Sequence, residues 1–151
     1  MRIALYEPDI PQNCGTLIRL GACLGVAVDI IEPCGFLFSD KGLKRAGMDY
    51  LDSAEIVRHA SWARFRAGHK QSGGRLVLLT SKAALPYTDF AFSPGDTILL
   101  GRESAGVPQE IHDAVDARLL IPMRPGLRSI NVAQAGAMVV GEALRQTKGF
   151  P

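Results

Sequence analysis

The sequence predicts an α/β domain in which helices flank a mainly parallel β-sheet. Short apolar segments alternate along the chain with segments of helical pattern, as in a sheet built from strand–helix–strand units. The apolar segments also lack the strict alternation of apolar and polar residues found in a strand with one solvent-exposed face. We therefore expect helices to cover both faces of the sheet. With 151 residues, the chain has the ordinary size of one domain, spanning residues 1–151.

Five segments are predicted as strands because they are short, apolar and bounded by Gly, Pro or Asp: residues 2–6, 26–31, 75–80, 97–100 and 118–121. Four segments are predicted as helices: residues 13–24, 61–67, 108–115 and 129–146. Ser61 and Ser129 stand where N-caps are expected. The last helix is rich in Gly and Ala although each Gly costs about 1 kcal/mol relative to Ala. This composition predicts a close approach, either by another element of the chain or by a second subunit.

Composition is that of a soluble globular protein, with 47% hydrophobic and 21% charged residues. The net charge of +2 is too small to indicate nucleic-acid binding by itself. Residues 56–88, however, contain six basic and no acidic residues: Arg58, Arg64, Arg66, Lys70, Arg75 and Lys82. They form either a basic surface that attracts phosphate or a solvated helix face.

Cys14, Cys23 and Cys34 have no spacing that predicts a disulfide framework or a zinc site. We expect them to be small buried residues in a reducing compartment, and we expect no metal. The N-terminus lacks the apolar segment of a signal peptide, and residues 132–140 are far too few to span a bilayer. A cytoplasmic protein without membrane contact is therefore expected.

Two loops that follow predicted strands, residues 101–108 and 122–131, carry Gly, Pro, Arg and Ser and could line a pocket for a nucleotide-like ligand. Three common sequence signatures of nucleotide-binding or nucleophile sites are not matched by this chain. Gly101 and Gly106 have the spacing of a P-loop, but Val107 and Pro108 replace its Lys and Ser/Thr. Arg102 replaces the first Gly of a nucleophile elbow, and no GxGxxG follows the first strand.

Three other segments carry a resemblance: Asn13-x-Gly15-x3-Arg19, Leu99 to Pro108, and Ile121-Pro122-Met123 leading to Arg128-Ser129-Ile130-Asn131-Val132. They resemble the three motifs of the SPOUT superfamily of RNA methyltransferases. Within it the chain is similar to the minimal TrmL/YibK-like group, tRNA 2′-O-methyltransferases that act on the wobble pyrimidine. Residues 6–11, 31–36 and 40–50 are also similar to that group, so the resemblance covers essentially the whole chain.

The resemblance implies a parallel sheet whose C-terminal segment forms a deep trefoil knot, a rare exception to ordinary connection rules. It also implies that S-adenosylmethionine binds in the knot, that tRNA is the substrate, and that two chains form a homodimer with active sites at the interface. The Gly- and Ala-rich last helix would then pack between subunits.

Site residues follow from the same resemblance. The positions implied for the cofactor are Leu79, Gly101, Glu103, Ile121, Met123 and Ser129, and those implied for catalysis are Arg19, Asn13, Ser129 and Asn131. RNA contacts are implied for Arg19, Lys44, Arg45, Arg124 and Arg128. Because a guanidinium stays protonated at neutral pH, we expect Arg19 to orient the ribose and stabilise oxyanion charge rather than act as a base.

Alternatives remain open for several of these residues. Gly101 is either a close-approach site for the cofactor or a turn glycine, and Asn13 and Ser129 are either functional or helix caps. Thr16, Gln134 and Gly141 stand where related sequences usually have Asn, Asn and Tyr. The competing functions are methylation of another tRNA or rRNA ribose, a non-catalytic RNA-binding module, and a flavodoxin-like nucleotide binder.

Overall fold

A computed structural model describes residues 1–38, 50 and 53–151 of the chain. Its strands are β1 (Arg2–Tyr6), β2 (Ala27–Ile31), β3 (Ile56–His59), β4 (Leu76–Leu79), β5 (Leu85–Pro86), β6 (Thr97–Leu100) and β7 (Ala117–Leu120). Its helices are α1 (Pro11–Leu24), α3 (Trp62–Ser72), α4 (Gln109–Ala114) and α5 (Val132–Thr147), with a 3₁₀ turn, η2, at Tyr87–Asp89. The strands form one sheet of order β3-β2-β1-β6-β4-β7-β5. Every strand pairing in this part of the chain is parallel, which confirms the predicted sheet.

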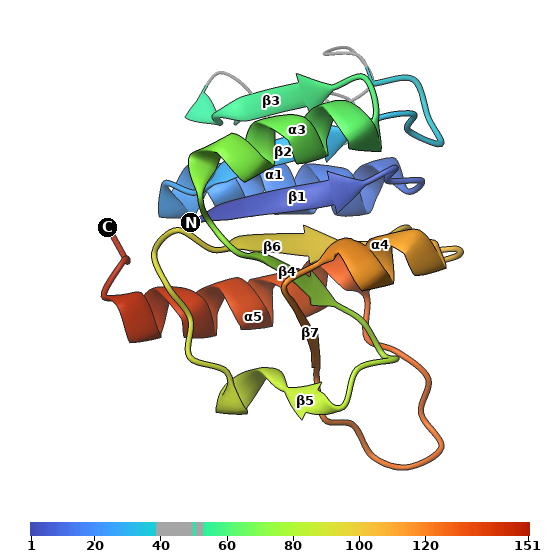
Figure 1. Cartoon of the computed structure of the whole chain (residues 1–151), viewed down its shortest axis with the longest axis vertical. Helices are drawn as coiled ribbons and strands as arrows, with labels where there is room; N and C mark the ends of the chain where they lie inside the picture. Colours follow the sequence, from blue (N-terminus) through green and yellow to red (C-terminus); the bar gives the residue numbers. More distant parts are fainter. Residues whose placement is uncertain (39–49, 51–52) are drawn as a thin grey trace.

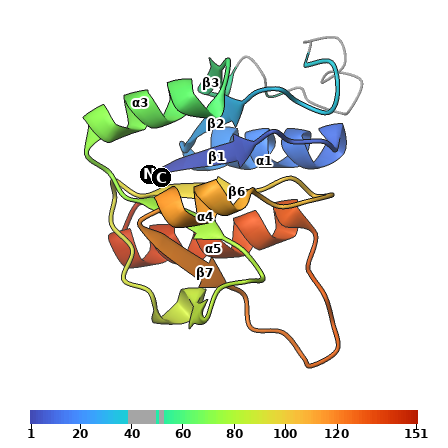
Figure 2. The same ribbon diagram turned by 45° about the vertical axis from the view of Figure 1, so that its right-hand side comes forward.

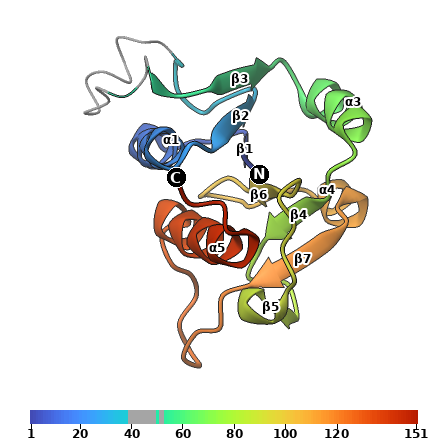
Figure 3. The same cartoon turned by 90° about the vertical axis from the view of Figure 1, so that its left-hand side faces the viewer.

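Helices cover both faces of the sheet, α1 and α5 on one side and α3 and α4 on the other (Figure 3). Ile3 and Leu5 of β1 join the core beneath α1 and α5. Ala4 and Tyr6 of the same strand join the core beneath α3 and α4. Because successive side chains of a strand point to opposite faces, a doubly covered strand needs apolar residues throughout. This arrangement explains the unbroken apolar segments.

Two strands of the sheet were not predicted. β3 lies at one edge, and Val57 and Arg58 in its centre are exposed, so it lacks a continuous apolar segment. β5 at the other edge has only two residues. Ser61 caps α3 as predicted, accepting a hydrogen bond from the Arg64 backbone at 3.3 Å. The helix continues to Ser72, five residues beyond the predicted end.

The close approach predicted for the last helix comes from within the chain at Gly136. A Cβ there would lie 2.8 Å from Leu17 Cδ2 of α1 and 2.9 Å from Leu100 Cδ1 of β6. A Cβ at Gly141 would meet nothing within 4 Å. Met138 on the same helix is 42% exposed. Gly136 thus serves the packing of α5 on its own sheet, and Gly141 is not required by it.

Because the strands are parallel, the loops that follow them meet at the carboxyl ends of the strands, on the right in Figure 1. We call this end the carboxyl edge of the sheet. The loop between β7 and α5, residues 121–131, projects away from the sheet beyond this edge (Figure 2). Polar and basic residues of the predicted site lie on these loops, and the carboxyl edge of a parallel sheet is the usual place for a ligand site.

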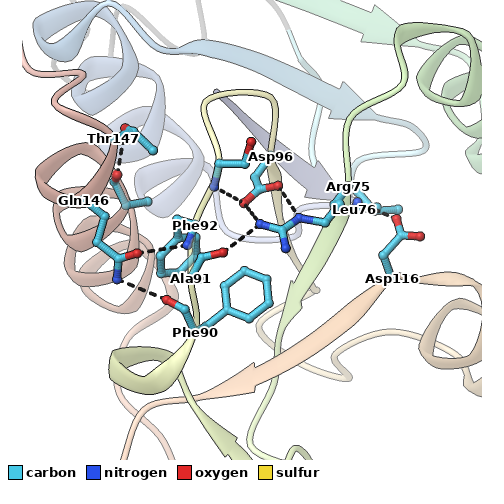
Figure 4. A network of polar contacts seen from close by, with 11 residues as sticks. Arg75, Leu76, Phe90, Ala91, Phe92, Asp96, Asp116, Gln146 and Thr147 are labelled. Carbon is cyan, nitrogen blue, oxygen red and sulfur yellow. Dashed lines mark hydrogen bonds and ion pairs between the residues drawn. The ribbon is translucent and has the colours of Figure 1, made fainter.

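At the amino ends of the strands, a polar network joins the start of β4, the segment before β6, and α5 (Figure 4). Arg75 donates to both carboxylate oxygens of Asp96, at 2.8 and 2.7 Å, and to Ala91 O at 2.8 Å. The Asp96 side chain is 1% exposed and also accepts the Ser93 N–H at 2.7 Å. Gln146 of α5 closes the network through the backbone on both sides of Ala91.

The cysteines agree with the prediction only in part. Cys14 is buried and Cys34 half-buried, but Cys23 is exposed, and all three are free thiols. Burial raises the pKa of Cys14 to about 12 and that of Cys34 to about 11, so neither is a reactive thiolate. No helix in the described ranges is both long and apolar enough to cross a membrane. Outside the gap at 39–49 and 51–52, no group of three or more potential metal ligands occurs.

Candidate active site

Two adjoining cavities occupy the carboxyl edge of the sheet. We call the first the apolar cavity; its volume is about 140 Å³. It is lined by Leu79, Thr80, Ser81, Leu100, Ile121, Met123, Ser129, Ile130, Val132 and Ala135. The polar cavity, of about 230 Å³, is lined by Ile10, Asn13, Glu103, Ser129, Ile130, Asn131 and Val132. Ser129, Ile130 and Val132 border both, so a ligand in one cavity lies beside a ligand in the other.

The structure brings most of the predicted cofactor and catalytic residues to these cavities. Leu79, Ile121 and Met123 line the apolar cavity, and Ser129 stands between the two. Asn13, Glu103 and Asn131 line the polar cavity. The apolar cavity is therefore lined by residues at the ends of β4 and β7, and the polar cavity by residues that follow β1 and β6. Both meet the start of α5.

Gly101 lines neither cavity, and its missing side chain serves the turn that follows β6. A Cβ there would lie 2.8 Å from the carbonyl carbon of Gly106. The two strands of this turn are tied by backbone hydrogen bonds of 3.0 and 2.8 Å between Arg102 and Gly106. This turn therefore requires a glycine at position 101, while the cofactor contact implied for Gly101 stays a prediction.

We expect Gly101→Ala to lower the free energy of unfolding by about 1–3 kcal/mol, because backbone atoms of Gly106 would have to shift. Gly68→Ala is the matched control, since a Cβ at that helical position meets nothing within 4 Å. That control should be neutral or stabilising. Urea unfolding of both variants tests this, and equal stability of Gly101→Ala and wild type would contradict it.

Asn131, not Ser129, caps the last helix. α5 begins at Val132, and Asn131 Oδ1 accepts the backbone N–H groups of Ala133 and Gln134 at 2.9 and 3.3 Å. The prediction of a helix from residue 129 with Ser129 as its cap was wrong by three residues, and Ser129 is exposed at the cavities instead.

Asn13 is likewise not a helix cap. α1 begins at Pro11, whose ring suits the first helical position, and no side chain caps the helix. Asn13 Oδ1 instead accepts a hydrogen bond of 2.9 Å from Asn131 Nδ2. This bond joins residues 118 positions apart and closes the polar cavity between the starts of α1 and α5.

Asp9 holds the Glu103 side of the polar cavity, and sequence reasoning missed it. Its carboxylate accepts the backbone N–H of Glu103 at 3.1 Å, the N–H of Ser104 at 3.3 Å and the Ser104 hydroxyl. Its own N–H donates to Glu103 Oε2 at 3.3 Å. The available signal was an acidic residue in the loop directly after the first strand.

The pKa values of Asp9 and Glu103 are shifted in opposite directions. Burial raises the pKa of the Glu103 carboxyl, and its interaction with Asp9 raises it further. The same interaction lowers the pKa of Asp9, aided by hydrogen bonds from the Ser104 side chain and the backbone. Asp9, whose carboxylate also lies 3.8 Å from Arg102 Nε, is therefore the stronger acid of the pair.

The predicted RNA-binding residues lie apart from the cavities or outside the described ranges. Arg19 is exposed on α1, with its guanidinium 4.6 Å from the centre of the Tyr50 ring, and lines neither cavity. At 100° per residue it points about 120° away from Asn13 around α1. Arg124 and Arg128 are exposed on the loop between β7 and α5. Lys44 and Arg45 lie outside the described residues.

Half of the basic residues between 56 and 88 form ion pairs or hydrogen bonds with other residues of the chain. Arg58 pairs with Glu32, Arg75 with Asp96, and Arg66 donates to Ala114 O at 2.8 Å. The other three, Arg64, Lys70 and Lys82, are exposed, so a basic surface in this segment would consist mainly of these three residues.

Comparison with known proteins places this geometry in a family. The SpoU rRNA methylase family matches residues 1–141. A tRNA (cytidine(34)-2′-O)-methyltransferase of Beijerinckia indica is 62% identical over 144 residues, covering 95% of this chain and 90% of that protein. The enzyme of the same name from Escherichia coli K12 is 40% identical, covering 100% and 96%.

Solved structures agree. A structure described for 2-OH methylation of C/U34 on tRNA superposes with a TM-score of 0.90 at 37% identity, covering 96% of this chain and 94% of that chain. The SpoU methyltransferase AviRb of Streptomyces viridochromogenes, in complex with AdoMet, has a TM-score of 0.84 at 25% identity, covering 97% of this chain and 60% of that chain. The resemblance drawn from the sequence is confirmed: the chain belongs to the SpoU rRNA methylase family.

Proposed function

We propose that this protein transfers a methyl group from S-adenosylmethionine to the ribose 2′-oxygen of the wobble pyrimidine, C or U at position 34, of tRNA. The observation that carries the proposal is the pair of adjoining cavities that share Ser129, Ile130 and Val132. The activity named for relatives of 40–62% identity supports it. Methyl transfer by in-line displacement breaks the S–CH3 bond as the O–CH3 bond forms, and it leaves S-adenosylhomocysteine and releases the 2′-hydroxyl proton. It needs a donor and an acceptor held side by side, which two joined cavities provide.

The apolar cavity fits the adenosyl part of the cofactor. Its lining is mostly apolar, with the hydroxyls of Thr80, Ser81 and Ser129 as the polar exceptions, as is usual for a nucleoside site. Leu79, Ile121 and Met123 would pack against it. When bound, the cofactor supplies a methyl group on a positively charged sulfur. We also propose that the loops around this cavity form the trefoil knot implied by the resemblance.

The polar cavity would hold the ribose. The hydrogen bond between Asn131 and Asn13 fixes both amides before the substrate arrives, and this preorganisation lowers the cost of orienting the 2′-hydroxyl. Asp9 holds Glu103 in place, so the Glu103 carboxyl would hydrogen-bond to a ribose hydroxyl.

Arg19 would act in the cavity of a second subunit. It points away from the cavities of its own chain, so a homodimer in which α1 and the outer face of α5 approach the partner would supply it. The exposed Met138 and the open position at Gly141 are compatible with such packing. Arg19, Arg124, Arg128, Lys44 and Arg45 would contact RNA phosphate, giving affinity that falls with salt. We place the dimer in the cytoplasm and expect no metal requirement.

Labelled S-adenosylmethionine, bulk tRNA lacking the modification and mapping of ribose methylation test the proposal. We expect label at the ribose of position 34. Cofactor binding without incorporation into any RNA would favour a non-catalytic binding module. Label in ribosomal RNA instead of tRNA would favour the alternative that the name of the matched family suggests.

Asn131→Asp separates helix capping from substrate positioning. The aspartate still accepts the two N–H groups at the helix start, where negative charge is favourable, but it cannot donate to Asn13. We expect an unchanged or higher melting temperature and a fall in kcat of about tenfold or more. Thermal unfolding and single-turnover methylation measure the two effects, and wild-type turnover would show that the Asn13 contact has no catalytic use.

A further inference from the structure

We propose that a hollow beside the polar cavity binds a nucleobase of the RNA strand that carries the methylated ribose. We call it the stacking hollow; its volume is about 350 Å³, and its lining includes Glu32, Pro33, Phe36, Leu37, Phe38 and Arg58. The inference rests on the proposed function, because it adds a second contact to the same RNA.

The hollow has the chemistry of a base-stacking site. The rings of Phe36 and Phe38 are stacked with centres 6.3 Å apart, and the Arg58 guanidinium lies 5.0 Å from the centre of the Phe38 ring. Leu37 between them is 85% exposed. Single-stranded RNA is bound in proteins by stacking its bases on aromatic rings and arginine planes.

The charge of the hollow favours a base over a phosphate. Arg58 Nε donates to Glu32 Oε1 at 2.9 Å, so its positive charge is largely neutralised by an adjacent carboxylate. A phosphate placed on Arg58 would be repelled by Glu32. A neutral planar ring meets no such repulsion and can use both the guanidinium plane and the phenyl ring.

The position of the hollow fits a neighbour of the methylated nucleotide. It follows β2 and β3, whereas the polar cavity follows β1 and β6, so the two sites are two strand spacings, or about 10 Å, apart along one edge of the sheet. Figure 1 shows the loops after β1, β2 and β6 on the same side of the molecule. A nearby nucleotide of the same strand can reach across this distance.

The two sites are also joined rigidly through Asp9. Gly35 N donates to Pro8 O at 2.9 Å, and a Cβ on Gly35 would lie only 2.7 Å from the Asp9 Cβ. Asp9 in turn holds Glu103 and Ser104 at the polar cavity. The loop that carries Phe36 and Phe38 therefore packs against Asp9, which holds residues of the polar cavity in place. This packing fixes the spacing between the base and the ribose.

The test uses the full-length protein and an RNA hairpin of the anticodon stem and loop, with 2-aminopurine placed in turn at each position around the wobble nucleotide. Stacking quenches 2-aminopurine fluorescence, so binding to wild type should quench one position near the methylated ribose. Phe38→Leu keeps an apolar side chain against the core but removes the aromatic face. We expect it to abolish that quenching and to weaken RNA binding about tenfold.

Phe38→Tyr is the matched control, because it keeps the ring and should keep both the quenching and the affinity. S-adenosylmethionine affinity should be unchanged in both variants. The inference is overturned if Phe38→Leu leaves quenching and affinity as in wild type, or if Phe38→Tyr loses them as fully as Phe38→Leu. Wild-type protein that never methylates the hairpin or tRNA contradicts the proposed function instead, whatever the fluorescence shows.

Discussion

Arg19→Ala is expected to lower the rate of methyl transfer by at least about a hundredfold while leaving the affinity for S-adenosylmethionine within about twofold of wild type. The reason is that Arg19 lies outside the cavity proposed for the cofactor and would act only on the ribose or the developing oxyanion. Single-turnover methylation and calorimetric titration with the cofactor measure the two effects. Equal loss of turnover and cofactor binding would show that Arg19 has a different role.

Two controls sharpen this prediction. Arg64→Ala removes an exposed arginine from the opposite face of the sheet and should leave turnover unchanged. Arg19→Lys keeps the charge but loses the planar fork, so it should restore only part of the activity.

Mixing subunits tests whether Arg19 serves the partner. Arg19→Ala and Asn131→Ala are each expected to be inactive alone. In a random mixture half of the dimers are mixed, and in each of these one of the two sites has both residues intact if Arg19 acts across the interface. About a quarter of wild-type activity should then return. No recovery would place Arg19 and Asn131 in the site of one chain.

Arg75→Ala is expected to lower the free energy of unfolding by about 2–4 kcal/mol. The substitution leaves the buried Asp96 carboxylate with the Ser93 N–H and removes the bond to Ala91 O (Figure 4). It also removes a guanidinium placed 4.7 Å from the centre of the Phe90 ring. The Arg75 side chain is 43% exposed, and solvent screening keeps the loss below that of a fully buried pair.

Urea unfolding measures this loss. Arg64→Ala again serves as control and should change stability by less than about 0.5 kcal/mol, since it lies on the helix surface. Adding Asp96→Asn to Arg75→Ala should recover part of the loss, because the uncompensated charge is gone. A double variant less stable than Arg75→Ala would mean that hydrogen bonding to the carboxylate outweighs its charge.

The central sheet could be predicted because its strands are covered on both faces. β1 and β6 have continuous apolar segments, which the sequence displays directly. β3 could not be found in the same way, because an edge strand with exposed Val57 and Arg58 carries no apolar pattern. The start of α5 was misplaced because Ser129 and Asn131 are both good caps, and only the three-dimensional structure distinguishes them.

The candidate site could be predicted only through the resemblance to known methyltransferases. No spacing rule relates Asn13 to Asn131, which meet because the loops after β1 and β7 both end at one edge of the sheet. Asp9 was missed because its role is to hold Glu103 and Ser104 in place, and an acidic residue after the first strand does not by itself indicate such contacts. Arg19 was matched by motif, whereas its distance from both cavities required the structure.

The contact between Asn13 and Asn131 has a consequence for the order in which the protein becomes competent during synthesis. The residues shared by both cavities are Ser129, Ile130 and Val132, so they leave the ribosome only after the seven strands of the described sheet have been made. A nascent chain that ends before α5 lacks Val132, which lines both cavities, and lacks the helix that packs with α1 on one face of the sheet. Catalytic competence thus arrives in one late step, together with the helix that completes the core.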